Sequence, residues 1–425
     1  MKKRLLTLLM VVAMACSMLT GCAAANQVKE KENVFADSAT KTDDGIVDLT
    51  VWVDAESIEM VQEMAKSFET LNATTKFSFT FVAQGEGDCK NVLLADMKNA
   101  GDVFAFADDQ LTSFIAAGVL SKVPNSGVAS ANTAESVDAS KYKNELYAYP
   151  MTADNGYFLY YNKKYFTEED LKTLDGILAV CAANGKTMTM DLSSGWYLYS
   201  FFGNTGLTMG LNADGVTNHC NWNATTDVSG AEVSGAEITQ AIADIIAHPG
   251  FQPGGDADFQ KGIVDGSVIA GVTGVWNAVA VQDAWGEDYG AVQLPTYTVA
   301  GKQIQMASFI GFKMVGVNAY SEEVEWAHKF ADYITNEKNQ TLRFVTRSQG
   351  PSNIKAAASE EVSASPAIQA VIAQSAYGTL QRVGNSYWDA CTSYSATLVA
   401  GNPDGKPMQD LIDILVEGIT KSVAQ

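Results

Sequence analysis

Three tryptophan residues occupy positions from which they could bind a ligand. Trp196, Trp276 and Trp388 lie at strand ends or in glycine-rich turns, outside the periodic apolar faces of the chain. Loops at strand ends are the usual ligand-binding segments of α/β proteins. The flat C–H face of a pyranose ring packs well on an aromatic ring. The three residues therefore indicate stacking against a sugar, whereas the competing interpretation of each single tryptophan is a core residue.

Two acidic stretches could supply the hydrogen-bonding half of such a site. Asp108 and Asp109 follow a strand-like segment, and Asp154 with Asn155 follows a tyrosine-proline pair. Carboxylate and amide oxygens accept strong hydrogen bonds from hydroxyl groups. Each stretch also has a purely structural interpretation, because the first could cap a helix and the second could form a turn. Both interpretations stay open at this point.

Signatures of catalytic, metal or cofactor sites are absent from the sequence. Its three histidines, His219, His248 and His328, have no partner at metal-ligand spacing. The Gly-Lys-Thr stretch at 185–187 mimics the end of a phosphate-binding loop, but Val180 stands where that loop needs glycine. We therefore expect a protein that is not an enzyme and carries no metal or cofactor. The alternative is a glycoside hydrolase, since that chemistry requires only two of the 49 Asp and Glu residues.

The elements that would position these residues alternate between strand-like and helix-like patterns. Strand-like segments alternate apolar and polar residues, and helix-like segments repeat apolar residues every three or four positions. The expected strands cover 47–53, 77–81, 103–106 and 157–161, and the expected helices cover 58–71, 238–246 and 411–419. This order predicts an α/β fold with mainly parallel strands.

The N-terminal residues indicate export. Basic residues at 2–4 precede an apolar run of about 15 residues, which is shorter than a membrane span of roughly 20. The run ends in Leu19-Thr20-Gly21-Cys22, which resembles the lipobox of bacterial lipoproteins. That resemblance implies a signal peptide at 1–21 and a diacylated Cys22, with residues 22–45 as a flexible tether. The alternative is an ordinary secretory signal that is cleaved elsewhere.

Size, charge and cysteine content describe the rest of the chain. About 380 residues exceed what one core usually serves, so we expect two lobes. The formal net charge of −21 argues against nucleic-acid binding, and removal of residues 1–21 would make it more negative. Cys89, Cys181, Cys220 and Cys391 allow three disulfide pairings or free buried thiols.

Several short segments together carry a family resemblance. They are Val51-Trp52-Val53, Gly101–Leu120, Tyr147–Met151, Tyr160–Lys163, Gly274-Val275-Trp276, Ser308–Gly311 and Gly350-Pro351-Ser352. In this order they resemble the extracellular sugar-binding proteins of ATP-driven importers, in the maltose- and maltodextrin-binding branch. The family implies two α/β lobes joined by three crossovers, with a ligand cleft that closes by hinge motion. The implied lobes are 46–152 with about 308–353, and 153–307 with about 354–425.

The resemblance also implies which residues bind the ligand. Phe106 matches a stacking aromatic residue, whereas Asp109 and Asp154 match carboxylates that bind sugar hydroxyls. Aromatic platforms of the second lobe are matched by Trp196, Tyr197, Trp276 and Trp388. The expected ligand-binding set is Phe106, Asp108, Asp109, Gln110, Asp154, Trp196, Tyr197, Trp276, Asn277 and Trp388.

Four positions depart from the maltodextrin-binding pattern. Gln110 and Thr392 stand where that branch has arginine, Ala278 replaces a second tryptophan, and Glu56-Ser57 occupies the place of a lysine. These departures leave the identity of the sugar open.

The function implied by the resemblance is delivery of an oligosaccharide to the permease of an ABC importer. We expect a monomeric lipoprotein at the outer face of the cell membrane, anchored by Cys22, with a malto-oligosaccharide as the first choice of ligand. The alternatives are a different glycan or a non-sugar solute such as a peptide, a polyamine or a metal complex.

Overall fold

The computed structural model describes residues 45–124, 127–226 and 231–421, and all of them belong to one compact unit of the chain. The predicted signal peptide and the predicted tether up to residue 44, with Cys22, lie outside the described residues. Within the described ranges, no helix combines the length and hydrophobicity that a membrane span requires. Cys89, Cys181, Cys220 and Cys391 are free thiols.

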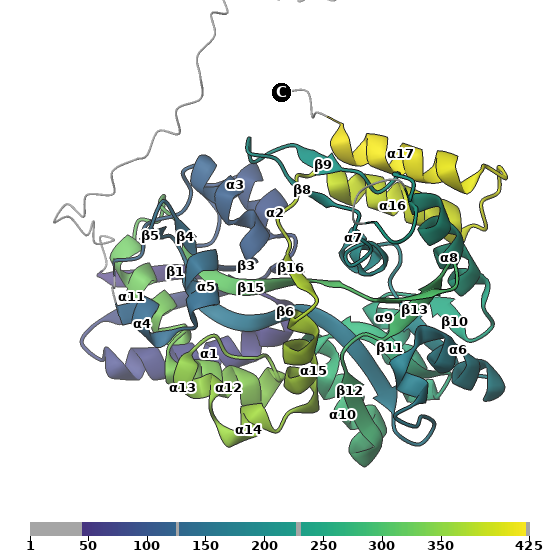
Figure 1. The fold of residues 1–425 in the computed structure, drawn as a ribbon. Helices are drawn as coiled ribbons and strands as arrows, with labels where there is room; N and C mark the ends of the chain where they lie inside the picture. The colour runs from purple at the N-terminus through teal and green to yellow at the C-terminus, as the bar shows by residue number, and fades with distance from the viewer. Residues whose placement is uncertain (1–44, 125–126, 227–230, 422–425) are drawn as a thin grey trace, which may run out of the picture. The chain divides into compact units, whose positions relative to one another are not determined.

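A mixed sheet organises the fold (Figure 1). Its strands are β1 (Ile46–Val53), β2 (Lys76–Ala83), β3 (Val103–Ala107), β6 (Tyr149–Asn162), β7 (Thr187–Met190), β10 (Phe251–Pro253), β11 (Val268–Gly274), β12 (Tyr289–Val292), β15 (Ser308–Val317) and β16 (Gly378–Leu380). The order is β10-β7-β11-β6-β15-β3-β1-β2, while β12 pairs with β6 and β16 pairs with β15. Three hairpins complete the strands: β4 (Lys141–Tyr142) with β5 (Glu145–Leu146), β8 (Met209–Leu211) with β9 (Asn218–Cys220), and β13 (Thr296–Val299) with β14 (Lys302–Gln305).

Helices connect and cover these strands. They are α1 (Ile58–Leu71), α2 (Cys89–Ala95), α3 (Leu111–Ala116), α4 (Gly127–Ala131), α5 (Ala134–Ala139), α6 (Leu174–Ala183), α7 (Gly195–Leu198), α8 (Gly235–Ala247), α9 (Asp256–Asp265), α10 (Ala278–Trp285), α11 (Val324–Ile334), α12 (Glu337–Arg347), α13 (Ile354–Ala357), α14 (Glu360–Ser363), α15 (Pro366–Ser375), α16 (Ser386–Val399) and α17 (Met408–Thr420). The α/β class and each strand and helix expected from periodicity are confirmed. In α1, for example, Met60, Val61, Met64 and Phe68 form the buried face, as the helical spacing predicts.

The expectation of mainly parallel strands holds for the outer strands but not for the two central ones. β1 runs parallel to β2 and β3, and β7 runs parallel to β10 and β11. However, β6 is antiparallel to β11, β12 and β15, and β15 is antiparallel to β3. The difference arises because β6 and β15 carry the chain between the two halves of the sheet.

The chain passes between the two halves of the sheet at three places. β6 pairs with β15 in the middle of the sheet, and Thr152 of β6 forms an isolated bridge with Pro351. The backbone N–H of Ala153 donates to the carbonyl oxygen of Gly350 at 3.0 Å. The segment around 350 therefore lies beside β6, as three crossovers require.

Buried apolar side chains form four clusters. Two combine residues within 47–151 with residues 312–334, and two combine residues within 157–309 with residues 344–419. The predicted lobe boundaries near 152, 308 and 353 stay predictions.

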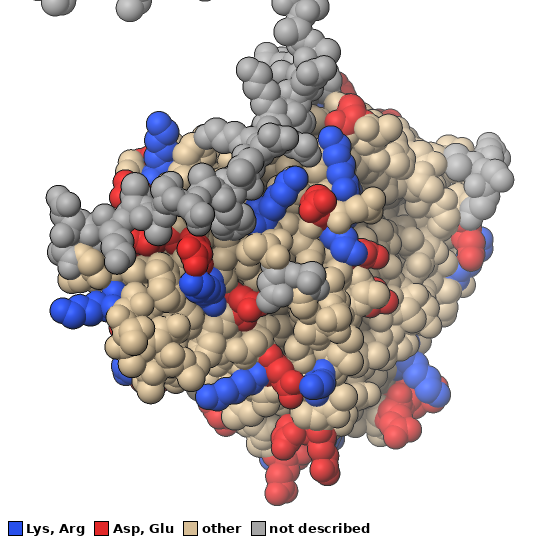
Figure 2. Space-filling model, turned by 90° about the vertical axis from the view of Figure 1, so that its left-hand side faces the viewer, with Lys and Arg blue, Asp and Glu red and all other residues tan. Residues whose placement is uncertain are grey.

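Charged side chains of both signs are interspersed on the face of the molecule shown in Figure 2. No broad basic area is visible among the described residues on that face. This distribution agrees with the net negative charge of the chain and argues against binding of a phosphate backbone there.

Candidate functional site

A cavity of about 820 Å³ lies where several strands end. β2, β3, β7 and β11 are each followed by a turn that contributes side chains to it. The lining residues are Glu86, Gly87, Asp88, Lys90, Asn91, Ala107, Asp109, Gln110, Asn155, Ser194, Trp196, Asp256, Trp276, Lys313, Gln381, Asn385, Trp388 and Asp389. Ligand sites of α/β proteins form at the carboxyl ends of strands, so this position is the expected one.

The three tryptophans line the cavity, and each of them is half-buried; we call them together the tryptophan wall. Trp196 lies in α7 and stacks against Phe309, with ring centroids 5.5 Å apart. Trp388 lies in the first turn of α16 and packs edge-on against Tyr387 at 5.0 Å. Their supports are rings of the core, so each indole presents only part of its surface to the cavity.

Trp276 is held more tightly than a surface tryptophan. It lies in the 3₁₀ turn η5 (Val275–Asn277) directly after β11, and its Nε1–H donates to Asp256 Oδ2 at 2.9 Å. The other carboxylate oxygen of Asp256 accepts from Thr273 Oγ1 and Asn277 Nδ2, each at 2.7 Å. A Cβ at Gly274 would lie 2.1 Å from the indole, so only glycine allows this ring position. The side chain is therefore pre-organised before any ligand arrives.

Two adjacent aspartates follow β3 in the 3₁₀ turn η2 (Asp108–Gln110), a segment that we call the acidic wall. Asp108 is buried, and its Oδ1 accepts from the backbone N–H of Phe312 at 3.0 Å. Asp109 lines the cavity, and its Oδ1 accepts from Gln381 Nε2 at 3.0 Å. Burial raises the pKa of Asp108 to about 6. Burial and the nearby Asp108 carboxylate raise the pKa of Asp109 to about 7.

Gln110 fixes the loop that forms the edge of this wall. Its Nε2 donates to the carbonyl oxygens of Glu86 and Gly87, at 2.6 and 3.0 Å. Its Oε1 accepts from the backbone N–H of Lys90 at 2.7 Å. The side chain therefore links the loop at 86–90 to the segment that follows β3.

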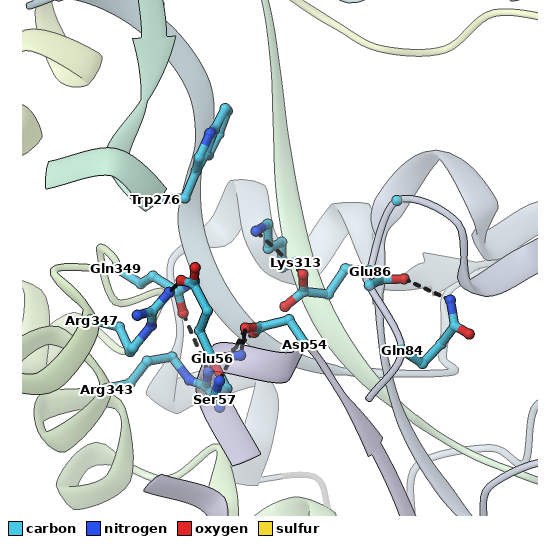
Figure 3. A network of polar contacts seen from close by, with 12 residues as sticks. Asp54, Glu56, Ser57, Gln84, Glu86, Trp276, Lys313, Arg343, Arg347 and Gln349 are labelled. Carbon is cyan, nitrogen blue, oxygen red and sulfur yellow. Dashed lines mark hydrogen bonds and ion pairs between the residues drawn. The ribbon is translucent and has the colours of Figure 1, made fainter. Parts of the chain in front are cut away.

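Lys313 and Glu86 form an ion pair near Trp276 (Figure 3). Lys313 Nζ is 3.6 Å from Glu86 Oε2 and 5.7 Å from the centroid of the Trp276 ring. Burial alone would lower the pKa of Lys313, but the carboxylates of Glu86, Asp154 and Asp54 raise it above its ordinary value. Lys313 is therefore a cation in a largely buried setting.

Further charged groups lie behind this pair in the same network (Figure 3). Arg343 Nη1 donates to Gln349 Oε1 at 3.3 Å, and Arg347 pairs with Glu56. Asp54 accepts from the hydroxyl group of Ser57 at 2.6 Å. Glu56, at the position that the resemblance matches approximately to a lysine, thus supplies a carboxylate that pairs with Arg347.

Five of the predicted ligand-binding residues line the cavity together. They are Asp109, Gln110, Trp196, Trp276 and Trp388. Asp109 and Gln110 come from the segment after β3, and the tryptophans come from the segments after β7 and β11 and from α16. The structure therefore brings together residues that lie up to 279 positions apart in the sequence.

The other five predicted residues are buried behind the walls and do not line the cavity. Phe106 packs against Phe114 with ring centroids 5.0 Å apart, and Tyr197 packs against Tyr157 at 4.9 Å. Asp108 and Asn277 make the hydrogen bonds given above. Asp154 accepts from the backbone N–H of Gly350, and burial raises its pKa.

Sequence reasoning missed several lining residues, among them Glu86, Asp256 and Lys313. A signal existed for each of these three. Glu86 stands between two glycines, Asp256 follows a pair of glycines, and Lys313 is a lone charge within an apolar strand. In the described residues, no group of three or more His, Cys, Asp or Glu side chains is placed to hold a metal ion. The cavity is thus equipped to stack rings and exchange hydrogen bonds with hydroxyl groups.

Similarity to known proteins agrees with this geometry. Residues 63–370 match the model of a family described as bacterial extracellular solute-binding protein. A galactooligosaccharide-binding protein of Bacillus subtilis (strain 168) is 26% identical, and the match covers 94% of this chain and 96% of that protein. A maltooligosaccharide ABC transporter solute-binding lipoprotein of Streptococcus pneumoniae (strain ATCC BAA-255 / R6) is 24% identical, with 97% of each chain covered.

Solved structures share the fold. One that was determined with acarbose has a TM-score of 0.78 and 29% sequence identity, and it covers 88% of this chain and 99% of its own. A maltodextrin binding protein from L. casei BL23, without ligand, has a TM-score of 0.70 and 22% identity over the same shares of the two chains. The two-lobed sugar-binding fold expected from the sequence is thereby confirmed. Because the family model extends over well more than half of the sequence, the chain belongs to the bacterial extracellular solute-binding proteins.

Proposed function

We propose that this protein binds an oligosaccharide in the cavity and delivers it to the permease of an ABC importer. The observation that carries the proposal is the pairing of three half-buried tryptophans with hydrogen-bonding side chains around one cavity of about 820 Å³. Apolar stacking and polar edges are the two surfaces that a sugar ring offers. The names of the relatives, which refer to galactooligosaccharides and maltooligosaccharides, support the same ligand class.

In this proposal Trp196, Trp276 and Trp388 stack against sugar rings, and Asp109 accepts hydrogen bonds from their hydroxyl groups. Gln110 belongs to the same ligand-binding set. The buried residues Phe106, Asp108, Asp154, Tyr197 and Asn277 support these side chains from behind. No ligand bond is broken, in keeping with relatives that are named as binding proteins.

The ligand bridges the two predicted lobes. It lies against side chains that come from both halves of the sheet, so it makes its full set of contacts only when the lobes are closed. Binding therefore shifts the population toward the closed form, with β6 and β15 as hinge strands. The permease recognises that form.

The anchor is the lipobox cysteine, Cys22, which holds the monomeric protein at the outer face of the cell membrane. Substitution Cys22→Ser should release the protein into the medium and leave its affinity for the ligand unchanged. Fractionation of cells and immunoblotting measure the release. Retention of the Cys22→Ser protein in the membrane fraction would contradict the anchor.

The ligand class is tested with a soluble form that begins after residue 22. Malto-, galacto- and xylo-oligosaccharides are titrated while tryptophan fluorescence and heat of binding are followed. We expect a malto-oligosaccharide to bind with the highest affinity. The second candidate is a galacto-oligosaccharide, which the name of the Bacillus subtilis relative favours. No response to any glycan would refute the proposal, and release of shorter products would favour a hydrolase.

A further inference from the structure

Glu86 is a buried carboxylate with unused hydrogen-bonding capacity at the cavity. The residue is 7% exposed and lines the cavity directly. Its Oε1 is buried and has no hydrogen-bond partner among the described residues. A buried carboxylate oxygen without a partner is unusual, because the loss of hydration is then not offset. This oxygen has almost no exposed surface, so a ligand hydroxyl group can donate to it only when the Glu86 carboxylate turns toward the cavity.

Lys313 offers the complementary donors. An ammonium group has three N–H donors. Its distance of 3.6 Å to Glu86 Oε2 is longer than a direct hydrogen bond. The side chain is only 14% exposed, and its raised pKa keeps it charged. Glu86 and Lys313 thus form a spaced donor and acceptor pair, which we call the Glu86–Lys313 pair.

The pair lies beside the best-fixed aromatic ring of the cavity. Lys313 Nζ lies over the Trp276 ring, 5.7 Å from its centroid, and Figure 3 shows Lys313 between Trp276 and Glu86. Gly274 and Asp256 hold that indole in place. A sugar ring beside Trp276 therefore lies next to the Lys313 ammonium, which is in turn 3.6 Å from Glu86 Oε2.

We propose that the Glu86–Lys313 pair binds two adjacent hydroxyl groups of the sugar unit that stacks on Trp276. One hydroxyl group donates to Glu86 Oε1, and its neighbour accepts from the ammonium of Lys313. The pair then determines specificity, because it requires a sugar unit with free vicinal hydroxyls at this position. This inference rests on the proposed function, since it assumes that a glycan occupies the cavity.

A test combines ligand analogues with variants. The best-binding glycan of the panel is compared with analogues in which single hydroxyls of one unit are removed or methylated. Binding to the wild type, Glu86→Gln and Lys313→Met is measured by calorimetry. We expect the loss of one charge-assisted hydrogen bond to weaken binding of the parent glycan about 10- to 100-fold in each variant. The variants should also no longer distinguish the parent from the analogue that lacks the matching hydroxyl.

A matched control is available on α1. Glu63 and Lys66 form an exposed ion pair at 2.6 Å, and Glu63→Gln and Lys66→Met should leave both affinity and hydroxyl dependence unchanged. If the Glu86 and Lys313 variants bind more weakly but keep the full hydroxyl dependence of the wild type, the pair is only structural and the inference is wrong. If one variant does not fold, the other variant and the wild type still test the inference. The inference is also wrong if the wild type binds every hydroxyl-modified analogue as tightly as the parent glycan. Failure of the wild type to bind any glycan would instead refute the proposed function.

Discussion

The two walls of the cavity are built in different ways. The tryptophan wall consists of uncharged rings that rest on the core, and its best example, Trp276, is fixed by a hydrogen bond at 2.9 Å and by a backbone contact that only glycine allows. The acidic wall consists of loop residues. Asp109 lines the cavity and Asp108 is buried behind it, and their pKa values are raised to about 7 and about 6. In the tryptophan wall, packing and a hydrogen bond fix the position of the Trp276 ring. In the acidic wall, the raised pKa values place the titration of the aspartates near neutral pH.

This difference suggests a division of roles. Stacking depends on shape and is insensitive to pH, so the tryptophan wall should supply most of the affinity. Hydrogen bonds to carboxylates depend on the position of each hydroxyl, so the acidic wall should supply selectivity. The predictions below test this division, from the largest expected effect to the smallest.

Removal of the Trp276 ring should have the largest effect. Trp276→Ala removes a pre-organised stacking surface, and we expect glycan affinity to fall about 10- to 100-fold. Isothermal titration calorimetry measures the change. Trp326→Ala is the control, because Trp326 is also half-buried but lies on α11 outside the cavity lining. Equal affinities of Trp276→Ala and the wild type would show that the platform is misassigned.

Displacement of the ring should have the next largest effect. The added methyl group of Gly274→Ala would lie 2.1 Å from the indole, so the ring must move. We expect affinity to fall about tenfold while the fold is retained. Gly255→Ala is the matched control, since its methyl group would meet only Asp191 Oδ2 at 3.7 Å. Circular dichroism and calorimetry separate loss of fold from loss of binding. If both glycine variants bind equally, fixation of the ring is unimportant.

Release of the ring from its hydrogen bond should have a smaller effect. Asp256→Ala removes the acceptor of the indole N–H and of the buried Thr273 and Asn277 side chains, but it leaves the contact of the indole with Gly274. We expect about a fivefold loss of affinity and greater mobility of the indole. Fluorescence anisotropy of single-tryptophan variants measures the mobility. Asp258→Ala, in the same helical turn, should leave both quantities unchanged.

The smallest effect concerns stability and pH. Because the pKa of Asp109 is raised to about 7 in the folded state, the folded protein binds more protons than the unfolded chain between about pH 4 and pH 7. Its contribution to the free energy of unfolding is therefore largest at low pH and falls as pH rises through this range. We expect Tm to decrease by a few degrees between pH 5 and pH 8 in the wild type and by less in Asp109→Asn.

A control for the pH effect is Asp138→Asn, which removes an exposed carboxylate from the ion pair with Lys141. This variant should keep the pH dependence of the wild type. Thermal unfolding followed by circular dichroism at several pH values measures all three proteins. An unchanged pH dependence in Asp109→Asn would mean that the acidic wall does not titrate as stated.

Much of the fold follows from local pattern. The helix at 58–71 and the strand at 47–53 were predictable because one apolar face repeats at a fixed period. The direction of β6 and β15 was not predictable from the sequence. Periodicity indicates which side chains are buried and carries no information on strand orientation. Antiparallel pairing of these strands depends on contacts between residues more than a hundred positions apart.

The candidate site also contains residues that the sequence predicted and residues that it could not predict. Trp196, Trp276 and Trp388 were predictable because they are large aromatic residues at strand ends or in turns, outside the periodic apolar faces. By contrast, Tyr197 adjoins Trp196, yet its side chain is buried against Tyr157, and sequence alone gives no direction for it. Lys313 and Glu86 meet only because β15 passes the loop after β2, which is a property of the tertiary fold.

The central place of β15 also determines when the sheet can be completed during synthesis. β15 supplies the hydrogen-bonding partner of both β3 and β6, yet it begins only at Ser308. Until the ribosome has passed that residue, β3 and the first half of β6 each keep an open edge. Pairing over such long sequence distances is slow, and open edges are prone to aggregation. A chain that stops before Ser308 therefore cannot close this sheet, whatever the state of its first three strands.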